Sequence, residues 1–310
     1  MKVALFGGTG FVGSYLVEAM LDRGHEPHLL VRQGSESKVT RADECILTQG
    51  DLGNMQAIHA TLAACEGVIY CVGIIRENQR VGPTFHQVHY EHAKAVMDAA
   101  VEAGVRRFIL MSANGVRPDG TAYQASKYMA EEYLKTTGLR WTIFRPSVIF
   151  GDPRGGMEFC TQLRDVLIKL PLPAPLFFRG LWPAEAGTFR MSPIHVRDVA
   201  AVFIQSLELL DAVEQTFELG GKAAVDWKTV VMNIARASGK RKWTLPVPAA
   251  ALQMLAALLD RFAFFPITRD QLTMLLEGNV ADSEAAYRVF DIDPVPFNSH
   301  SLAYLRESRE

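Results

Sequence analysis

The sequence contains no apolar run long enough to span a bilayer, which takes about 20 residues. The most apolar segment, residues 247–265, is interrupted by Pro248, Gln253, Asp260 and Arg261. Because these residues break the apolar face, we favour a mostly buried helix over one that touches a membrane or a hydrophobic partner. A membrane-spanning helix is therefore not expected.

The sequence also has few cysteines and a small net charge. The four cysteines, Cys45, Cys65, Cys71 and Cys160, lack the paired spacing of metal sites, so we expect buried thiols in a reducing compartment and no metal. A formal net charge of −2 gives no electrostatic reason to expect a nucleic-acid partner. The first strand pattern begins at residue 2, so we expect no targeting peptide and a cytoplasmic protein, either free or peripheral at the inner membrane.

The most informative segment lies at the N-terminus. An apolar run, Val3 to Phe6, leads directly into Gly7-Gly8-Thr9-Gly10-Phe11-Val12-Gly13, and a helical pattern follows. A strand, a glycine-rich turn and a helix in this order are typical of a dinucleotide-binding fingerprint. We expect Gly8 to permit the tight turn, Gly10 to let the backbone approach the pyrophosphate, and Gly13 to let helix and strand pack closely. The N–H groups and positive dipole at the start of the helix would bind the phosphates, so the sequence predicts a bound dinucleotide.

Short apolar runs rich in β-branched and aromatic residues recur along the first half of the chain, as in buried parallel strands. Helical patterns separate them, most clearly over residues 85–103 and 123–136. The further predicted strands are 28–31, 44–47, 67–72, 107–111 and 141–144. This alternation predicts an α/β fold with a doubly wound parallel Rossmann sheet, which binds ligands at the carboxyl ends of its strands.

The pattern changes after Gly151. Residues 152–191 are rich in Pro and Gly, and the chain from about residue 223 is mostly helical. We therefore predict an NADP-binding Rossmann domain over residues 1–151 and about 192–222. Residues 152–191 and 223–310 would form a smaller, mostly helical C-terminal cap domain that binds a substrate or a partner.

The second strand lacks the Asp or Glu that NAD-binding folds usually place at its end. It ends instead with Val31 and Arg32, and Ser35, Ser37 and Lys38 follow. The planar Arg32 guanidinium suits a phosphate dianion, so we predict NADP(H) in preference to NAD(H). The alternative is a solvated arginine at the end of a strand.

Two further segments are expected beside the cofactor. Asp51 and Leu52 follow the third strand, where the carboxylate would reach the adenine amino group, cap the helix over residues 54–62, or do both. Val72 and Gly73 follow the fourth strand, where only a small residue would let the backbone pass the adenosine side of the cofactor.

Tyr123 and Lys127 are four residues apart on a predicted helix and would project from one face. A cation beside a phenol favours the phenolate, which makes proton transfer near neutral pH feasible. Tyr90 and Lys94 have the same spacing, so the pattern alone has little specificity. Only Tyr123 follows a strand that ends in a hydroxyl residue, Ser112, and we therefore favour Tyr123 and Lys127 as site residues.

Six motifs together resemble the extended or atypical short-chain dehydrogenase/reductases, over essentially the whole chain. They are Gly7 to Gly13, Gly50 to Leu52, Ser112-Ala113, Tyr123 with Lys127, Phe144 to Gly151 and Ile194 to Ala200. Segments 217–221, 245–248 and 267–272 resemble one branch of this superfamily. That branch contains the NAD(P)H-binding accessory subunit of respiratory complex I and its bacterial relatives.

The resemblance implies roles for individual residues. Tyr123 would protonate or deprotonate the reacting oxygen, and Lys127 would bind the nicotinamide ribose and lower the tyrosine pKa. Ser112 would hold the substrate carbonyl. The nicotinamide side of the pocket would be lined by Arg145, Pro146 and Ser147.

Three histidine and aspartate positions are also implied by the resemblance. His195 and Asp198 would lie near the junction of the two domains, with a structural role rather than a chemical one. His89 occupies the place where active members often have an Asn that supports a proton relay. This departure puts the relay in doubt, although it leaves cofactor binding unaffected.

The resemblance implies two main functions. The first is an accessory or assembly protein that holds NADP(H) in a membrane respiratory complex. The alternative is an NADPH-dependent oxidoreductase that acts on a hydrophobic carbonyl, alcohol or quinone-like substrate, such as ubiquinone, with Tyr123 as general acid or base. The apolar segment 170–178, with Leu181 and Trp182, would line its pocket or contact the complex. A sugar epimerase is disfavoured, because the cap is apolar where sugar hydroxyls require polar partners.

Overall fold

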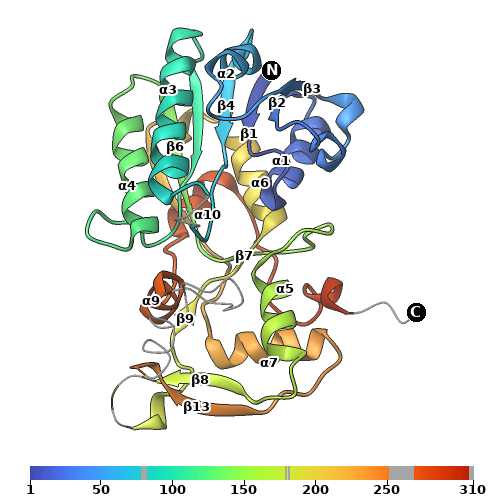
Figure 1. The fold of residues 1–310 in the computed structure, drawn as a ribbon, viewed down its shortest axis with the longest axis vertical. Coiled ribbons are helices and arrows are strands. Elements are labelled where there is room, and N and C mark those ends of the chain that lie inside the picture. Colours follow the sequence, from blue (N-terminus) through green and yellow to red (C-terminus); the bar gives the residue numbers. More distant parts are fainter. Residues whose placement is uncertain (78–81, 179, 181, 251–268, 307–310) are drawn as a thin grey trace. The chain divides into compact units, whose positions relative to one another are not determined.

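The computed structural model describes residues 1–77, 82–178, 180, 182–250 and 269–306 (Figure 1). These residues form two compact units. Unit 1 comprises Met1–Pro146, Val196–Leu219 and Ser283–Ile292. Unit 2 comprises the described parts of Ser147–His195, Gly220–Asp282 and Asp293–Glu310. Leu181, most of the predicted helix over 247–265 and part of the motif 267–272 lie outside the described residues.

Unit 1 is built on a seven-stranded sheet in which every pairing is parallel. In spatial order the strands are β11 (Gln215–Leu219), β6 (Arg140–Pro146), β5 (Arg107–Met111), β4 (Gly67–Tyr70), β1 (Lys2–Phe6), β2 (Glu26–Val31) and β3 (Ile46–Gln49). The strand order reverses between β1 and β4, and doubly wound sheets bind their ligands at such a reversal. The predicted α/β fold with a doubly wound parallel sheet is confirmed.

The strand ends differ slightly from the predicted ranges. β3 begins at Ile46 rather than at residue 44, because Ala42–Glu44 form a 3-10 turn entered through Arg41, whose φ is +53°. β6 continues past Phe144 to Pro146 because its last residues pair with β11. β11 itself is a seventh strand that the apolar pattern of the first half of the chain does not predict.

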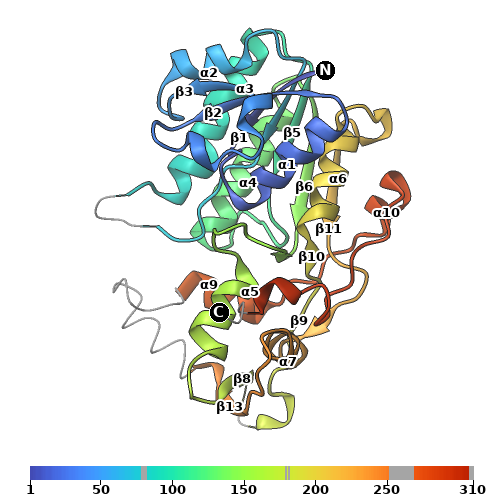
Figure 2. The ribbon, with the colours of Figure 1, turned by 90° about the vertical axis from the view of Figure 1, so that its right-hand side faces the viewer.

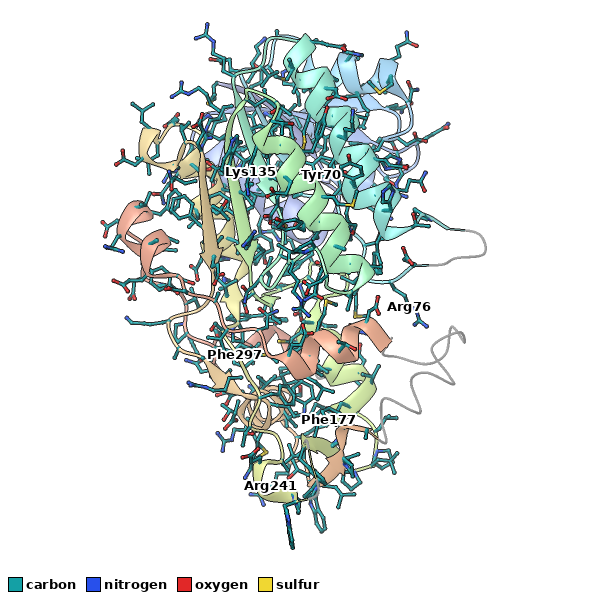
Figure 3. All side chains as sticks on the ribbon, turned by 90° about the vertical axis from the view of Figure 1, so that its left-hand side faces the viewer. Tyr70, Arg76, Lys135, Phe177, Arg241 and Phe297 are labelled. Carbon is teal, nitrogen blue, oxygen red and sulfur yellow. The ribbon has the colours of Figure 1, made fainter. Side chains whose placement is uncertain are left out.

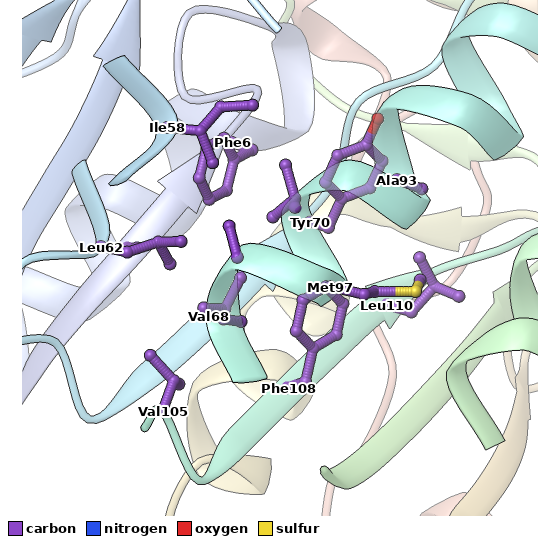
Figure 4. Close-up of a cluster of buried hydrophobic side chains, with 14 of the residues drawn as sticks. Phe6, Ile58, Leu62, Val68, Tyr70, Ala93, Met97, Val105, Phe108 and Leu110 are labelled. Carbon is purple, nitrogen blue, oxygen red and sulfur yellow. The ribbon is translucent and has the colours of Figure 1, made fainter. Parts of the chain in front are cut away.

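One face of the sheet carries three helices. They are α2 (Met55–Leu62), α3 (His92–Glu102) and α4 (Ala122–Lys135). Their buried side chains form one apolar cluster with the strands, which includes Phe6, Ile58, Val68, Tyr70, Met97 and Phe108 (Figure 4). Burying each large side chain of this kind stabilises the fold by about 2 kcal/mol. The cluster packs α3 and α4 against β4 and β5.

The other helices of unit 1 lie away from this cluster. α1 (Phe11–Asp22) and α6 (Val196–Ser206) contact each other (Figure 2). α10 (Glu284–Phe290) packs beside β11, where the Phe290 ring lies 5.1 Å from the Phe217 ring and 5.7 Å from the Phe144 ring. This aromatic packing explains why residues 283–292 belong to unit 1, although the sequence analysis placed them in the smaller domain.

Unit 2 combines short strand pairs with helices. The strand pairs are β7 (Ile149–Phe150) with β10 (Ile194–His195), β9 (Arg190–Met191) with β12 (Val225–Asp226), and β8 (Ala174–Phe178) with β13 (Thr244–Pro248). The helices are α5 (Phe159–Leu163), α7 (Trp227–Ala237) and α9 (Arg269–Glu277). Its core includes Phe177 (Figure 3). The ring centre of Phe177 lies 6.0 Å from that of Trp227 and 6.3 Å from that of Phe189.

Two structural features are absent from the described part of the chain. None of its helices is long and apolar enough to cross a membrane. None of its His, Cys, Asp and Glu side chains gather into a group that could hold a metal ion. The four cysteine thiols are free, and those of Cys65 and Cys160 are buried.

Candidate active site

The turn between β1 and α1 depends on three glycines in different ways. Gly7 has a φ of +103°, a backbone conformation that favours glycine. The sequence analysis expected Gly8, and not Gly7, to permit the tight turn. A Cβ at Gly8 would lie 2.4 Å from Cδ2 of Leu29, so β2 occupies the space of a side chain there. A Cβ at Gly13 would lie 2.1 Å from the carbonyl oxygen of Gly7 and would force the helix away from the turn.

The first turn of α1 is open to an anion. Gly10 is its N-cap, no side chain caps the helix, and its first turn holds no acidic residue. The first N–H groups of an α-helix lack partners within the helix, and the dipole there is positive. A Cβ at Gly10 would approach only the Gly7 carbonyl oxygen, at 3.3 Å, so the protein leaves the other side of Gly10 free. Thr9, Phe11 and Val12 are partly exposed around this turn, which therefore fits a phosphate group.

Arg32 lies directly after β2 and is exposed. It forms no ion pair with any residue in the described part of the chain, so its guanidinium is available to a ligand. No carboxylate follows β2 at this position.

Asp51 lies in the turn that follows β3. Its carboxylate oxygen Oδ1 accepts a hydrogen bond from the N–H of Gly53 at 2.9 Å. The alternative prediction that Asp51 caps the next helix is wrong, because the N-cap of α2 is Asn54, whose side chain accepts from the N–H of Ala57. Leu52 packs against the apolar cluster of unit 1.

A capping box determines where α4 begins. The Thr121 hydroxyl accepts from the N–H of Gln124, and the Gln124 side chain accepts from the N–H of Thr121. These bonds satisfy two backbone donors and start the helix at Ala122, one residue before Tyr123. The spacing then places Lys127 one turn further along, with Nζ 5.7 Å from the centre of the Tyr123 ring.

Burial controls the acid–base properties of this pair. Lys127 is buried, and its Nζ donates to the carbonyl oxygen of Met111 at 3.1 Å. Desolvation lowers the pKa of Lys127 to about 8, although the nearby Glu131 opposes this change. Desolvation also raises the pKa of Tyr123 to about 12, so the expectation that Lys127 lowers this pKa is wrong: burial of the phenol outweighs the nearby cation. At neutral pH the site therefore holds a phenol beside an ammonium.

A chain of hydrogen bonds passes through His89. Its Nε2 accepts from the backbone N–H of Ile74 at 3.1 Å, so the ring proton resides on Nδ1. Nδ1 then donates to Oγ of Ser126 at 3.0 Å, and that hydroxyl donates to the Tyr123 carbonyl at 3.0 Å. Burial and the charge of Lys127 lower the pKa of His89 to about 2. His89 is thus a neutral connector between the loop after β4 and the first turn of α4.

Aromatic contacts complete the surroundings of Tyr123. The Tyr123 ring makes edge contacts with His89 at 5.1 Å and with Phe85 at 5.6 Å between ring centres. Phe85 also stacks on His89. His89 lies in a π-helical segment, His86–Glu91, just before α3, and such segments occur often at functional sites.

Ser112 carries a buried hydroxyl that lacks a partner. It directly follows β5, and its N–H donates to the carbonyl oxygen of Phe144 at 2.8 Å. Its Oγ is buried and has no hydrogen-bond partner among the described residues. Ser112, Lys127 and His89 line the same small pocket. A buried hydroxyl without a partner is costly, so this geometry fits a polar ligand atom at Ser112.

Gly73 lies beside His89 and Lys127. A Cβ on Gly73 would be 3.5 Å from Nε2 of His89 and 3.7 Å from Nζ of Lys127. These are ordinary contact distances, so the protein alone does not require glycine at this position. Val72 lines the same small pocket.

The predicted nicotinamide-side residues have other partners in the structure. The Arg145 guanidinium forms a two-bond pair with Glu131 of α4, with Nε at 3.0 Å from Oε1 and Nη2 at 2.5 Å from Oε2. Glu131 is fully buried, and this pair attaches α4 to β6. Pro146 ends β6, and its carbonyl accepts from the N–H of Asn114. Ser147 belongs to unit 2, where its hydroxyl donates to the carbonyl of Asn279.

The remaining predicted residues lie outside the cluster. Lys94 pairs with Asp98 at 2.7 Å and lies over the Tyr133 ring, so the second Tyr-Lys spacing serves the surface of α3. His195 is the last residue of the first segment of unit 2, Ser147–His195, and its ring packs on Phe150. Asp198 lies in α6 of unit 1.

Sequence reasoning missed three site residues: Phe85, Ser126 and Glu131. Ser126 lies inside the Tyr123-Lys127 motif, but its partner His89 is 37 residues away in sequence. Arg145 and Glu131 are 14 residues apart. The sequence does contain one local signal for this region, the capping pattern of Thr121 and Gln124, which predicts where α4 begins.

This chain is similar to a number of named proteins and solved structures. A ceramide reductase from Caulobacter vibrioides is 29% identical and aligns with 84% of this chain and 78% of its own length. The 40 kDa subunit of mitochondrial NADH-ubiquinone oxidoreductase from Neurospora crassa is 24% identical and aligns with 98% of this chain and 79% of its own length. The crystal structure of gox2253 superposes with a TM-score of 0.76 at 21% identity, over 98% of this chain and 96% of that one, which shows the fold alone.

One protein family matches this chain over the segment that contains the site. Residues 7–166 match the family described as NAD(P)H-binding, and this segment is just over half of the 310 residues. It begins at the glycine-rich turn and includes Arg32, Ser112 and Lys127. The family match supports a nicotinamide dinucleotide as the cofactor. The chain belongs to the NAD(P)H-binding family, with a Rossmann fold in unit 1.

Proposed function

We propose that this protein is an NADP(H)-dependent oxidoreductase that interconverts a carbonyl and an alcohol group of a hydrophobic substrate. The observation that carries the proposal is the unpartnered Ser112 hydroxyl, which is buried in the same pocket as the Lys127 ammonium. The relative named as a ceramide reductase supports a lipid-like substrate.

Unit 1 supplies the residues that would hold the cofactor. The turn from Gly7 to Gly13 would hold the pyrophosphate, and Arg32 would contact the ribose phosphate that distinguishes NADP(H) from NAD(H). Asp51 and Leu52 would contact the adenosine, and Val72 and Gly73 would pass beside the nucleotide. Lys127 would bind the nicotinamide ribose. When bound, the reduced nicotinamide supplies the hydride that adds to the carbonyl carbon.

The chain's own residues handle the proton. Ser112 donates a hydrogen bond to the carbonyl oxygen and orients it. Tyr123 transfers its phenolic proton to that oxygen as the alcohol forms, and the Lys127 charge stabilises the resulting phenolate. His89 stays neutral and keeps the Tyr123 turn of α4 fixed to the loop after β4. It acts as a positioning residue.

Substitution of the phenol tests this function. Tyr123→Phe removes the proton donor without removing the ring, so kcat for reduction of long-chain keto lipids should fall by about 10²–10⁴-fold. NADPH consumption gives the rate, and NADPH affinity should stay within about twofold because the phenol is not the main contact of the nucleotide. Tyr90→Phe is the matched control, since Tyr90 has the same spacing to a lysine, and it should keep its activity. Turnover retained in Tyr123→Phe would eliminate the proposed acid.

A second function has one specific observation in its favour. The mitochondrial 40 kDa subunit aligns with 98% of this chain, and its printed name links it to NADH-ubiquinone oxidoreductase. In this alternative the protein is an accessory or assembly factor of a membrane respiratory complex, near a quinone, and NADP(H) stabilises its folded state. A ligand at a thousand times its Kd stabilises a protein by about 4 kcal/mol.

Gentle purification distinguishes the two functions. Mass spectrometry of the native protein identifies the bound nucleotide and any proteins that co-migrate with it. Slowly exchanging NADPH together with respiratory-complex subunits supports the accessory function, in which Tyr123→Phe has little effect. A free protein whose nucleotide exchanges readily supports the enzyme.

A further inference from the structure

Unit 2 exposes large apolar side chains beside the paired strands β8 and β13. The exposed fractions of Leu170, Leu172, Trp243 and Leu245 are 48%, 65%, 82% and 55%. The two segments lie against each other, because Nζ of Lys242 donates to the carbonyl of Leu170 at 2.6 Å and the N–H of Ala174 donates to that of Trp243 at 2.7 Å. These four apolar residues are called the Trp243 surface below.

The surroundings of the Trp243 surface are basic. In segments 164–173, 236–245 and 299–306, seven of the eight charged residues are Lys or Arg, whereas the whole chain has a net charge of −2. The acid in these segments, Asp165, is neutralised by ion pairs with Arg164 and Lys169. A second acid, the exposed Glu185, lies in the 3-10 turn Pro183–Glu185, which contacts β8 and β13. The exposed side chains Arg236, Lys240, Arg241 and Arg306 form no ion pair among the described residues.

Two of these cations border a hollow. Arg236 at the end of α7 and Arg306 line it together with Ser299 and His300. The chain passes from the end of α7 directly into β13 (Figure 1), so Lys240 and Arg241 connect this hollow to Trp243. Hydroxyl and guanidinium donors around a hollow are suited to an anionic headgroup.

The Trp243 surface is poorly suited to a protein partner. Pro246 and Pro248 in β13 and Pro175 in β8 lack N–H donors, which blocks the addition of a further strand. Protein–protein interfaces are enriched in Trp and Arg but depleted in lysine, and Lys240 and Lys242 lie within three residues of Trp243. Exposed Trp and Leu beside Lys and Arg are instead typical of surfaces that lie in the interface of an anionic membrane.

We propose that the Trp243 surface docks unit 2 on an anionic lipid bilayer. Trp243, Leu245 and their two leucine neighbours enter the headgroup region, and the surrounding cations contact lipid phosphates. This surface is separate from the cofactor turn of unit 1, so the proposal goes beyond the proposed function and does not depend on it. It places the protein where a lipid-like substrate is found.

Vesicle co-sedimentation of the full chain tests the proposal. Vesicles of phosphatidylcholine alone are compared with vesicles that also contain phosphatidylglycerol. The wild type should bind the anionic vesicles at least tenfold more tightly, and raising the salt concentration should weaken this binding. The double variants Trp243→Ser/Leu245→Ser and Lys240→Glu/Arg241→Glu should each lose at least tenfold in binding.

Matched controls keep this result interpretable. Leu210→Ser removes a leucine that is 70% exposed in unit 1, and Lys228→Glu reverses an exposed charge at the opposite end of α7. Both should bind within twofold of wild type, and circular dichroism should show all variants folded. No vesicle binding, or an equal loss in the controls, overturns the proposal. So does a wild-type dimer in light scattering that Trp243→Ser/Leu245→Ser dissociates, because a second copy would then cover the surface.

Discussion

Burial shifts the pKa of Lys127 and that of Tyr123 away from the values that these groups have in water. Lys127 titrates at about 8 and Tyr123 at about 12, so the phenol remains protonated while the ammonium approaches its titration range. Desolvation disfavours both charged forms, and proton transfer from Tyr123 is helped only while Lys127 is charged. In the proposed reduction, the Lys127 charge at neutral pH would stabilise the phenolate that Tyr123 leaves when it gives up its proton.

The pH profile tests this role of the Lys127 charge. In the direction of reduction, kcat/KM should be level at neutral pH and fall above about pH 8, as Lys127 in the free enzyme loses its proton. It should show no step near pH 6.5, because the pKa of His89 is lowered to about 2. Lys127→Arg keeps a cation to higher pH and should move the fall upward. A Lys127→Arg profile identical to that of the wild type would assign the fall to another group.

His89 makes the stability of the fold depend on pH in the acid range. Its ordinary pKa of 6.5 falls to about 2 in the folded protein, so the unfolded chain binds the proton more readily between these values. The contribution of His89 to stability is complete above pH 6.5 and is lost progressively as the pH falls toward 2.

A substitution measures this contribution. His89→Phe leaves the Ile74 N–H and the Ser126 hydroxyl without their partner, so it should lower the free energy of unfolding by about 1–3 kcal/mol at neutral pH. The variant should also show a smaller loss of stability in acid than the wild type. His86→Phe alters an exposed histidine of the same π-helical segment and serves as control. Equal effects of the two substitutions in chemical denaturation would contradict the role of His89.

At the scale of elements, the turn between β1 and α1 contains one glycine that the fold requires, Gly13, and one that only a bound ligand would require, Gly10. A Cβ at Gly13 would meet backbone atoms at 2.1 Å and 2.7 Å, which cannot move without breaking the turn. Gly10 has a φ of −85°, which any residue adopts, and only one contact at 3.3 Å. Gly13 is therefore required for close packing of the helix on the turn, whereas Gly10 leaves space for a ligand.

Paired alanine substitutions test this separation. Gly13→Ala should destabilise the protein by about 3 kcal/mol in thermal or chemical unfolding. Gly10→Ala should cost less than about 1 kcal/mol, because alanine is only a poorer N-cap than glycine. Its methyl group should nevertheless weaken NADPH binding by at least tenfold in calorimetry. Wild-type NADPH affinity in Gly10→Ala would remove this turn from the proposed cofactor site.

At the scale of the whole molecule, the two units are interleaved in sequence. The chain crosses between them after Pro146, His195, Leu219, Asp282 and Ile292. A fragment that ended at residue 151 would lack β11, α6 and α10, and the sheet would lose an edge strand and the aromatic packing of Phe290. Cofactor effects on stability are therefore best measured on the full chain.

Nucleotide-dependent stability of the full chain tests cofactor choice. Arg32→Glu should strongly reduce the rise in melting temperature that NADPH causes and should leave the smaller effect of NADH nearly unchanged. A tenfold loss of affinity corresponds to about 1.4 kcal/mol of lost stabilisation at saturating ligand. Arg23→Glu, at an exposed arginine that follows α1, is the control. Equal losses for both nucleotides would contradict the preference for NADP(H).

The sequence by itself determined the features that are local along the chain. Apolar runs predicted the parallel strands, because a strand buried on both faces needs apolar residues throughout. The glycine spacing predicted the turn before α1, and the four-residue spacing placed Tyr123 and Lys127 on one helix face. These signals span a few residues each, so no knowledge of the tertiary fold is needed to recognise them.

Only the tertiary structure decided how distant residues are used. Arg145 lay in a motif that implied cofactor contact, but the buried carboxylate of Glu131 must be neutralised and Arg145 is the cation beside it. The partners of His89 come from the loop after β4 and from α4, and residues 283–292 join unit 1 through Phe290. Such pairings depend on which groups packing brings together and buries, and an unpaired buried charge or donor is costly wherever its partner lies in the sequence.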